Sequence, residues 1–244
     1  MATDTFKSRP TRILVGASVR QTQEVFDAYW LSLKALKPPR NCELSFAFVN
    51  DDPSLLWPAN CAVLPAPTRP VDAEYAVDAV THRWNVSTFE HLAKCKQLLL
   101  DYAISNQFDY IFLVDSDLLL DPGTLQSMYA VGQDVVNANF WTQWTPLDQP
   151  LPQCWLTHPY GLDGLGRRAD EYLQALHKHQ LVKVLGGGAC VLIKVNKLKE
   201  GLRYHPRMQL PMEGMWQGED RSFAVRCQQM HINQYVDAWP QIYH

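Results

Sequence analysis

The stretch that decides the fold class is RILVGASVRQTQEVFDAYWLSLKALKPPRNCELSFAFVNDDP, residues 12–53. Two short apolar runs, 12–16 and 44–49, flank a segment in which large apolar side chains recur at helical spacing before Pro38 and Pro39. A strand, a helix and a second strand joined by short links predict a parallel sheet, because parallel strands need a crossover connection that is usually helical. We therefore expect an α/β fold, with a mostly parallel central sheet flanked by helices.

The remaining elements follow the same alternation of apolar strands and amphipathic helices. Strands are expected at 110–114, from 135, within 182–195 and at 235–236. Helices are expected from a capping box with Ser87 as N-cap and Glu90 at N3, from Pro122 to Gly132, and around 223–230.

Two segments, 53–82 and 141–180, lack a clear periodicity and are expected to be irregular. We find no linker between two domains. We therefore expect one domain over 1–244, with a tail at 1–11, a nucleotide-binding half at about 12–120 and an acceptor-binding half at about 121–244.

The composition is that of a globular protein and excludes several classes. Hydrophobic residues make up 47% of the 244 residues, and 22 basic against 25 acidic side chains give a net charge of −3. This balance excludes a disordered chain and argues against nucleic-acid binding through bulk positive charge. The chain has no apolar run long enough to span a membrane, no secretory signal and no CxxC pair among its six cysteines. We expect a cytoplasmic protein with free thiols, no nucleic-acid partner and no transmembrane segment.

Two carboxylates interrupt the most apolar run of the sequence, DYIFLVDSDLLL at 109–120. Asp115 and Asp117 would be costly to bury without a partner, and they would repel each other. A divalent cation between them would remove both costs, and carboxylate oxygens suit Mg²⁺ or Mn²⁺. The end of a strand in an open α/β sheet is also where ligands bind. The alternative for a lone DxD pattern is a solvated turn or a helix cap.

Three further segments combine a functional and a structural interpretation. Glu219 and Asp220 precede an expected helix, where acidic side chains also serve as ordinary caps. The glycines at 186–188 interrupt an extended stretch and predict a close backbone approach, whereas their spacing excludes a Rossmann phosphate loop. His244 ends the chain, a place where histidine is usually frayed and exposed.

The order of these segments resembles the GT-A nucleotide-sugar glycosyltransferases, and among them the bacterial glycosyltransferase family 2-like proteins. The combination of DSD and, later, GED is its more specific part. One departure is Cys95, since many relatives have Asn after the basic residue of that segment. The segments that carry the resemblance are ILVGASVRQ (13–21), FVNDDP (48–53), THRWN (81–85), AKCKQLLLDYA (93–103), FDYIFLVDSDLLLDPGTL (108–125), FWTQW (140–144), GGGACVLI (186–193) and WQGEDRSFAVR (216–226).

The resemblance implies a single GT-A, Rossmann-like domain and a hexosyltransferase-type enzyme. Such an enzyme moves a sugar from a UDP- or GDP-sugar to a hydroxyl of a carbohydrate or another acceptor, with Mn²⁺ or Mg²⁺ as cofactor. Asp117 would bind the metal, Asp115 would hold the ribose or the metal through water, and His244 would be a C-terminal metal ligand. Asp220, with Glu219 beside it, would deprotonate the acceptor hydroxyl in an inverting mechanism.

The resemblance also implies contacts to the nucleotide and to the acceptor. The nucleotide would be bound by Ala17, Arg20, Asp51, Asp52, Arg83, Lys94, Asp115 and Ser116. The acceptor or sugar would be lined by Trp141, Trp144, Trp155, Gly187, Gly188 and Trp216.

Several alternatives remain open from the sequence. A retaining glycosyltransferase of the same fold would carry the same acids and differ in the product anomer. A sugar nucleotidyltransferase is disfavoured because the chain has no glycine-rich, basic phosphate loop near its start. A glycoside hydrolase would use paired acids without nucleotide or metal, and a carbohydrate- or nucleotide-binding module would bind without turnover. Because the sequence stops at His244, the chain is also considered as one module of a longer polypeptide.

Overall fold

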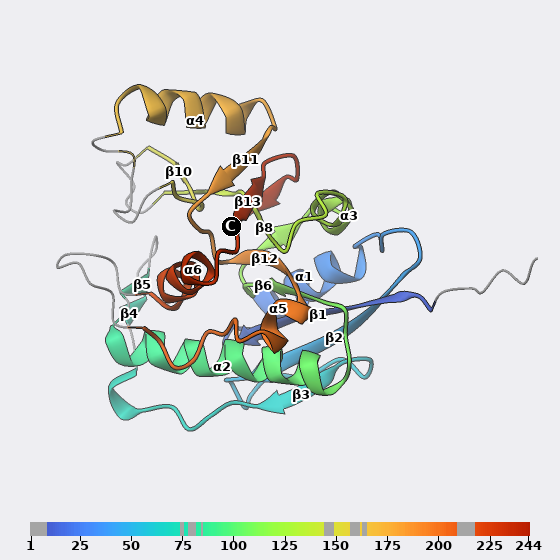
Figure 1. Cartoon of the computed structure of the whole chain (residues 1–244). Helices are drawn as coiled ribbons and strands as arrows, with labels where there is room; N and C mark the ends of the chain where they lie inside the picture. The colour runs from blue at the N-terminus through green and yellow to red at the C-terminus, as the bar shows by residue number, and fades with distance from the viewer. Residues whose placement is uncertain are drawn as a thin grey trace, which may run out of the picture.

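An eight-stranded sheet forms the centre of the protein, in a computed structural model that describes residues 9–73, 76–77, 82–83, 85–143, 149–156, 162, 165–208 and 218–244 (Figure 1). Its strands lie in the order β11-β13-β8-β12-β6-β1-β2-β3. Their bounds are β1 Thr11–Val19, β2 Cys42–Asn50, β3 Ala62–Pro65, β6 Tyr110–Val114, β8 Val135–Ala138, β11 Leu181–Val184, β12 Cys190–Lys194 and β13 Gln234–Asp237.

Most neighbouring strands of this sheet run parallel. The pairs β1–β2, β2–β3, β1–β6 and β8–β13 are parallel, whereas β12 is antiparallel to both β6 and β8, and β11 is antiparallel to β13. The register places Val15 opposite both Phe46 and Phe112. The predicted α/β fold with a mostly parallel sheet is therefore confirmed.

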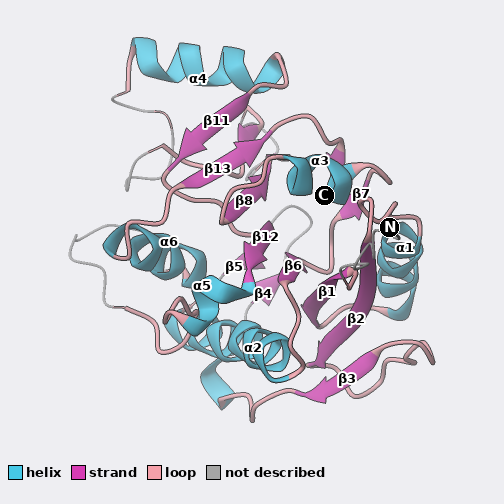
Figure 2. Ribbon diagram, turned by 45° about the vertical axis from the view of Figure 1, so that its right-hand side comes forward, coloured by secondary structure: helices cyan, strands magenta, loops and turns pink. Residues whose placement is uncertain are grey.

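Helices cover both faces of the sheet, as the two ribbon views show (Figures 1 and 2). Alternate residues of β1 serve the two faces: Ile13 and Val15 pack in the same core as α1 and α3, whereas Leu14 packs in the core of α2, α5 and α6. This alternation is the period of a strand buried on both sides. The helices are α1 Gln23–Lys34, α2 Val86–Ser105, α3 Thr124–Ala130, α4 Arg167–His177, α5 Val195–Lys199 and α6 Glu219–Gln229.

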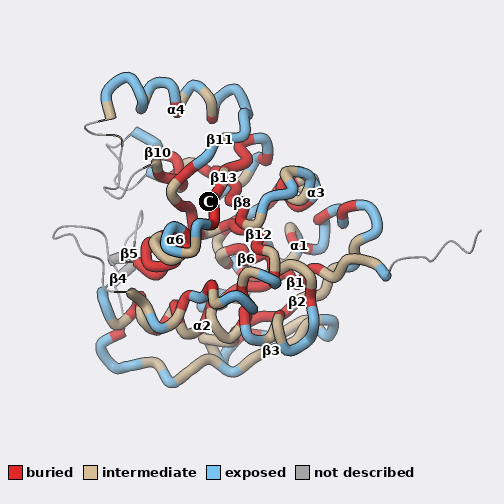
Figure 3. Tube along the Cα trace, viewed as in Figure 1, coloured by how far each residue is buried: buried red, intermediate tan, exposed pale blue. Residues whose placement is uncertain are grey.

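Short elements complete the described chain: the 3₁₀ turn η1 Val71–Ala73 and the paired strands β4 Ala76–Val77 with β5 His82–Arg83, β7 Leu119–Leu120 with β14 Ile242–Tyr243, and β9 Trp141–Thr142 with β10 Leu151–Pro152. In Figure 3 the buried residues follow the central strands, whereas α4 is largely exposed. None of the helices in the described part of the chain is long and apolar enough to cross a membrane. All six cysteines are free thiols.

The expected irregular segments contain regular structure. The stretch 53–82 includes β3, an edge strand whose residues alternate between half-buried and exposed, so that its apolar signal is weak. The stretch 141–180 includes α4, in which only Tyr172 and Leu176 are buried among charged and polar neighbours. Both expectations are wrong for the same reason, because an element at the margin of a domain buries few side chains and leaves little periodicity in the sequence.

The expected starts of two helices are also corrected. Asn85, not Ser87, is the N-cap of α2, since its side chain accepts a hydrogen bond from the Thr88 backbone N–H at 2.8 Å. Helix α3 begins at Thr124 rather than Pro122, because the Asp121 side chain accepts from the Gly123 N–H at 2.7 Å and forms a turn before the helix. Asx turns of this kind compete with helix caps in sequence.

Candidate active site

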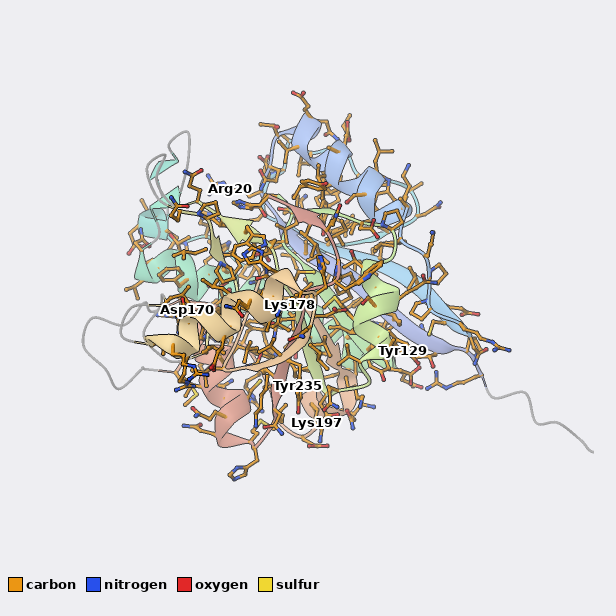
Figure 4. The ribbon with its side chains drawn as sticks, turned by 90° about the horizontal axis from the view of Figure 1, so that it is seen from above. Arg20, Tyr129, Asp170, Lys178, Lys197 and Tyr235 are labelled. Carbon is orange, nitrogen blue, oxygen red and sulfur yellow. The ribbon has the colours of Figure 1, made fainter. Side chains whose placement is uncertain are left out.

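The candidate site lies at the carboxyl ends of the parallel strands β1, β2 and β6. We call this end of the sheet its carboxyl edge and the opposite end its amino edge. These strands are parallel and adjacent, so the residues that follow them, Arg20, Asp51 and Asp115, leave the sheet at the same edge. In Figure 4, Arg20 lies on the opposite side of the ribbon from Lys197 and Tyr235, which mark the other edge. The carboxyl end of parallel strands is where α/β sheets bind ligands.

Backbone hydrogen bonds fix the turn that carries the DSD segment. The Asp115 N–H donates to the Ala189 carbonyl at 2.7 Å, and the Leu118 N–H donates to the Asp115 carbonyl at 3.2 Å. Behind the turn, the hydroxyl of Tyr29 on α1 donates to the Val114 carbonyl at 2.8 Å. The strand end is therefore held by α1 on one face of the sheet and by the segment that leads into the neighbouring strand β12, and its carboxylates emerge in a defined place.

A buried lysine on α2 joins acids from two distant segments. The Nζ of Lys96 lies 2.9 Å from Oε1 of Glu219, 3.1 Å from Oδ1 of Asp220 and 3.5 Å from Oδ1 of Asp115. Burial opposes a charged lysine, but the three carboxylates outweigh it and raise the pKa of Lys96 well above its usual value. Limited solvation and the neighbouring acids raise the pKa of both Asp115 and Asp220, while Lys96 opposes this rise.

The start of α6 brings the second acidic pair to this lysine. Glu219 and Asp220 form its first turn, where the helix dipole and unpaired N–H groups favour negative charge. The Asp220 carboxylate lies directly against Gly188, because a Cβ on that glycine would come within 2.0 Å of Oδ2 of Asp220. The close backbone approach that the glycine run predicts is therefore to the candidate base.

The last strand returns the C-terminus to the DSD segment. Strand β14 pairs antiparallel with β7, with Tyr243 opposite Leu119. This pairing brings Nε2 of His244 to 3.6 Å from Oδ2 of Asp117. The neighbouring Asp117 carboxylate raises the pKa of His244, against a smaller effect of burial.

The Asp117–His244 pair offers a divalent cation one carboxylate and one imidazole. The described residues contain no group of three or more His, Cys, Asp or Glu side chains arranged to hold a metal ion, and Asp115 contacts Lys96. However, Mg²⁺-type ions are commonly held by one or two carboxylates together with substrate phosphates and water. The Asp117 carboxylate fits that smaller ligand set, and the His244 imidazole lies beside it.

Asp51 and Asp52, which follow β2, differ in their surroundings. The side chain of Asp51 is only 6% exposed and is ion-paired with Arg69, and it also lies 2.9 Å from Nε2 of His91 on α2. Although burial opposes it, these two partners lower the pKa of Asp51 below its usual value. Asp52 instead accepts hydrogen bonds from the backbone and hydroxyl of Ser54.

The other predicted nucleotide contacts are spread along the same edge. Arg20 is exposed, and Ser116 is buried and accepts a hydrogen bond from the side chain of Gln21 at 3.4 Å. Ala17 belongs to the core beneath α1, and Lys94 is half-buried on α2. The side chain of Arg83 lies outside the described part of the chain.

The predicted acceptor side is resolved in part. Trp155 is buried, and the guanidinium of Arg221, in the first turn of α6, lies 4.1 Å from its ring centroid. Trp141 is stacked on His177 of α4, with ring centroids 4.8 Å apart. Gly187 approaches the side chains of Asn137 and Cys154. Trp144 and Trp216 lie outside the described residues.

Sequence reasoning missed Lys96, although the sequence of α2 contains a signal that could have indicated it. Ala93, Leu99 and Leu100 are buried on this helix, and Lys96 lies among them at spacings of three and four residues. A lysine within an apolar stripe requires a buried partner of opposite charge. Sequence reasoning also missed Arg69, His91 and Arg221, which are further buried or nearly buried basic side chains in this region.

Comparisons with known proteins support the fold. No protein-family model matches the chain, and no curated protein matches it either. Among solved structures it is similar to S. aureus TarS 1–349, a glycosyltransferase, with a TM-score of 0.52 and 12% sequence identity. The match covers 95% of this chain, which spans 60% of the length of that TarS structure. At this identity the likeness concerns the fold alone: the chain has a fold similar to that of TarS.

Proposed function

We propose that this protein is a metal-dependent, hexosyltransferase-type enzyme that moves a sugar from a UDP- or GDP-sugar to an acceptor hydroxyl. The observation that carries the proposal is the meeting of two acidic segments at one lysine. Asp115, at the end of β6, and Asp220, at the start of α6, both lie within 3.5 Å of Nζ of Lys96. A donor-side acid and an acceptor-side acid in one place, on a glycosyltransferase-like fold, suit group transfer better than simple binding.

The DSD turn and the C-terminus would form the donor side. Asp117 and His244 would hold Mn²⁺ or Mg²⁺ together with the diphosphate. Bound there, the ion would neutralise the charge that develops on the leaving diphosphate. Asp115 and Ser116 would contact the ribose, and the exposed Arg20 offers a positive charge at the same edge of the sheet.

Asp220 would act on the acceptor side as the general base. Its hydrogen bond from Lys96 and its place at a helix N-terminus favour the carboxylate form, while limited solvation and Glu219 raise its pKa. A base with a raised pKa accepts a proton more readily near neutral pH. In an inverting reaction Asp220 takes the hydroxyl proton as the oxygen attacks the sugar from the face opposite the diphosphate. In a retaining reaction Asp220 only orients the acceptor, and the anomer of the product, read by NMR, distinguishes the two.

Calorimetric titration of UDP and GDP tests the donor side. We expect one nucleotide to bind with Mn²⁺ and not with EDTA, and we expect Asp117→Ala to abolish that metal-dependent binding. Asp134→Ala is the matched control, since the two side chains are similarly exposed, at 36% and 37%, and Asp134 lies at the other edge of the sheet. Binding of neither nucleotide by the wild-type protein, or unchanged binding by Asp117→Ala, would overturn this proposal.

A further inference from the structure

Residues from several elements surround the side chain of Lys96. Its side chain is only 5% exposed, and its ammonium contacts acids from β6 and from α6. It also lies 5.5 Å from the ring centroid of Tyr204, which stacks on Phe223 of α6 at 4.4 Å. Helix α2 therefore contacts the first turn of α6 through the two ion pairs of Lys96, and the stacked Tyr204 and Phe223 lie beside them.

The Asp220 carboxylate is constrained on both oxygens. Lys96 donates a hydrogen bond to Oδ1 at 3.1 Å, and Oδ2 lies against the Cα of Gly188. Glu219 beside it is 8% exposed and accepts from Lys96 at 2.9 Å, so it cannot easily exchange the lysine for water. One cation thus sets two acids of the same helical turn and faces Asp115 across the site.

We propose that Lys96 is a positioning residue, which orients the Asp220 carboxylate toward the acceptor and ties it to Asp115 on the donor side. This proposal rests on the proposed function and adds to it. Lys96 need not touch either substrate. Without its charge, Asp115, Glu219 and Asp220 would repel one another, and the first turn of α6 would lose the contact that sets the direction of Asp220.

If Lys96 had only a structural role, it would serve to neutralise the charge of the buried Glu219 carboxylate. The two roles are separated by combining Lys96→Met with Glu219→Gln, because this pair of changes removes the uncompensated buried charge and leaves Asp220 without its hydrogen-bond donor. If Lys96 serves only stability, the double variant recovers both stability and turnover. If Lys96 positions Asp220, the double variant recovers stability alone. Glu219→Gln by itself is the reference for any direct effect of Glu219.

The experiment measures transfer rates at varied donor concentration, together with urea unfolding, for the wild type and the variants. We expect Lys96→Met to lower kcat about 100-fold, with donor KM changed less than about threefold. Lys96→Arg should recover about tenfold of that loss, because a guanidinium can still donate to both acids. Lys194→Met, which removes a lysine paired at the other edge of the sheet, should keep kcat within about twofold.

Two outcomes would overturn the role of Lys96: a folded Lys96→Met protein with kcat near that of the wild type, or recovery of kcat in the double variant. Either outcome leaves the proposed function intact, because the wild-type enzyme still transfers sugar. A wild-type protein that transfers no sugar from any UDP- or GDP-sugar overturns the proposed function, and with it the positioning role.

Discussion

The two edges of the central sheet pair their charged side chains differently. At the amino edge of the parallel strands, Asp109 is paired with Arg9, and Asp134 is paired with Lys194. At the carboxyl edge, Asp115, Glu219 and Asp220 share Lys96, and Asp117 faces His244. The acids named at the amino edge have their own partners, whereas three acids of the carboxyl edge share one lysine.

This difference indicates that the arrangement of charges at the carboxyl edge costs stability and serves function. Exposed ion pairs such as Arg9–Asp109 are worth little and leave no charge to be satisfied. Several acids around one buried lysine lower the stability of the fold unless a bound ligand or cation compensates their charge. The proposed divalent metal would offset part of the negative charge of these crowded acids, and three paired substitutions compare the two edges.

The largest effect is expected from neutralising one acid at each edge. Asp220→Asn should lower kcat about 10²–10⁴-fold, because an amide cannot take the proton from the hydroxyl of the sugar acceptor. Donor binding should be kept. Asp134→Asn at the amino edge should leave kcat unchanged. Initial rates and nucleotide titration provide both quantities, and normal turnover by Asp220→Asn would place the base elsewhere.

A smaller loss is expected from adding one methyl group at each edge. Gly188→Ala would place a Cβ 2.0 Å from Oδ2 of Asp220 and must displace the carboxylate, with an expected loss of about 100-fold in kcat. Gly132 has φ +73° and open space around it, so Gly132→Ala should cost about 1–2 kcal/mol of stability without affecting kcat. Thermal unfolding, measured together with the rates, distinguishes backbone strain at Gly132 from displacement of the Asp220 carboxylate. An unaffected kcat in Gly188→Ala would contradict this geometry.

The smallest effect concerns stability at acid pH. The pKa of Asp51 is lowered from 3.8, so its pairing with Arg69 and His91 stabilises the fold fully above pH 3.8 and is lost as the pH falls through the lowered folded-state pKa. Asp51→Asn should cost about 1.5–3 kcal/mol at neutral pH, and the difference from wild type should shrink below pH 3.8.

Asp109→Asn is the amino-edge counterpart of that change. The pKa of Asp109 is also lowered, through Arg9 and Arg12, but its side chain is 31% exposed. Urea unfolding across pH should therefore show a smaller difference from wild type for Asp109→Asn than for Asp51→Asn. Equal differences would mean that burial of the Asp51 cluster does not matter.

Much of the fold could be predicted because its central elements are buried on both faces. Strand β6 spans residues 110–114 as the apolar run indicates, and β1 and β2 surround their predicted cores. Helix α4 and strand β3 were missed because they lie at the margin, where few side chains are buried. The acids of the site were also visible, since carboxylates beside apolar runs are rare without a reason.

The sequence by itself determined the α/β class and the place of Asp115 and Asp117 at the end of a strand, because strand burial follows from local periodicity and strand direction from the helical crossovers. Only the tertiary structure decided which cation meets those acids. Lys94 and Lys96 are two residues apart in the same helix and so point in different directions, and the resemblance pointed to Lys94. Lys96 contacts Glu219 and Asp220, more than 120 residues further along the chain, and no local pattern specifies so distant a pairing.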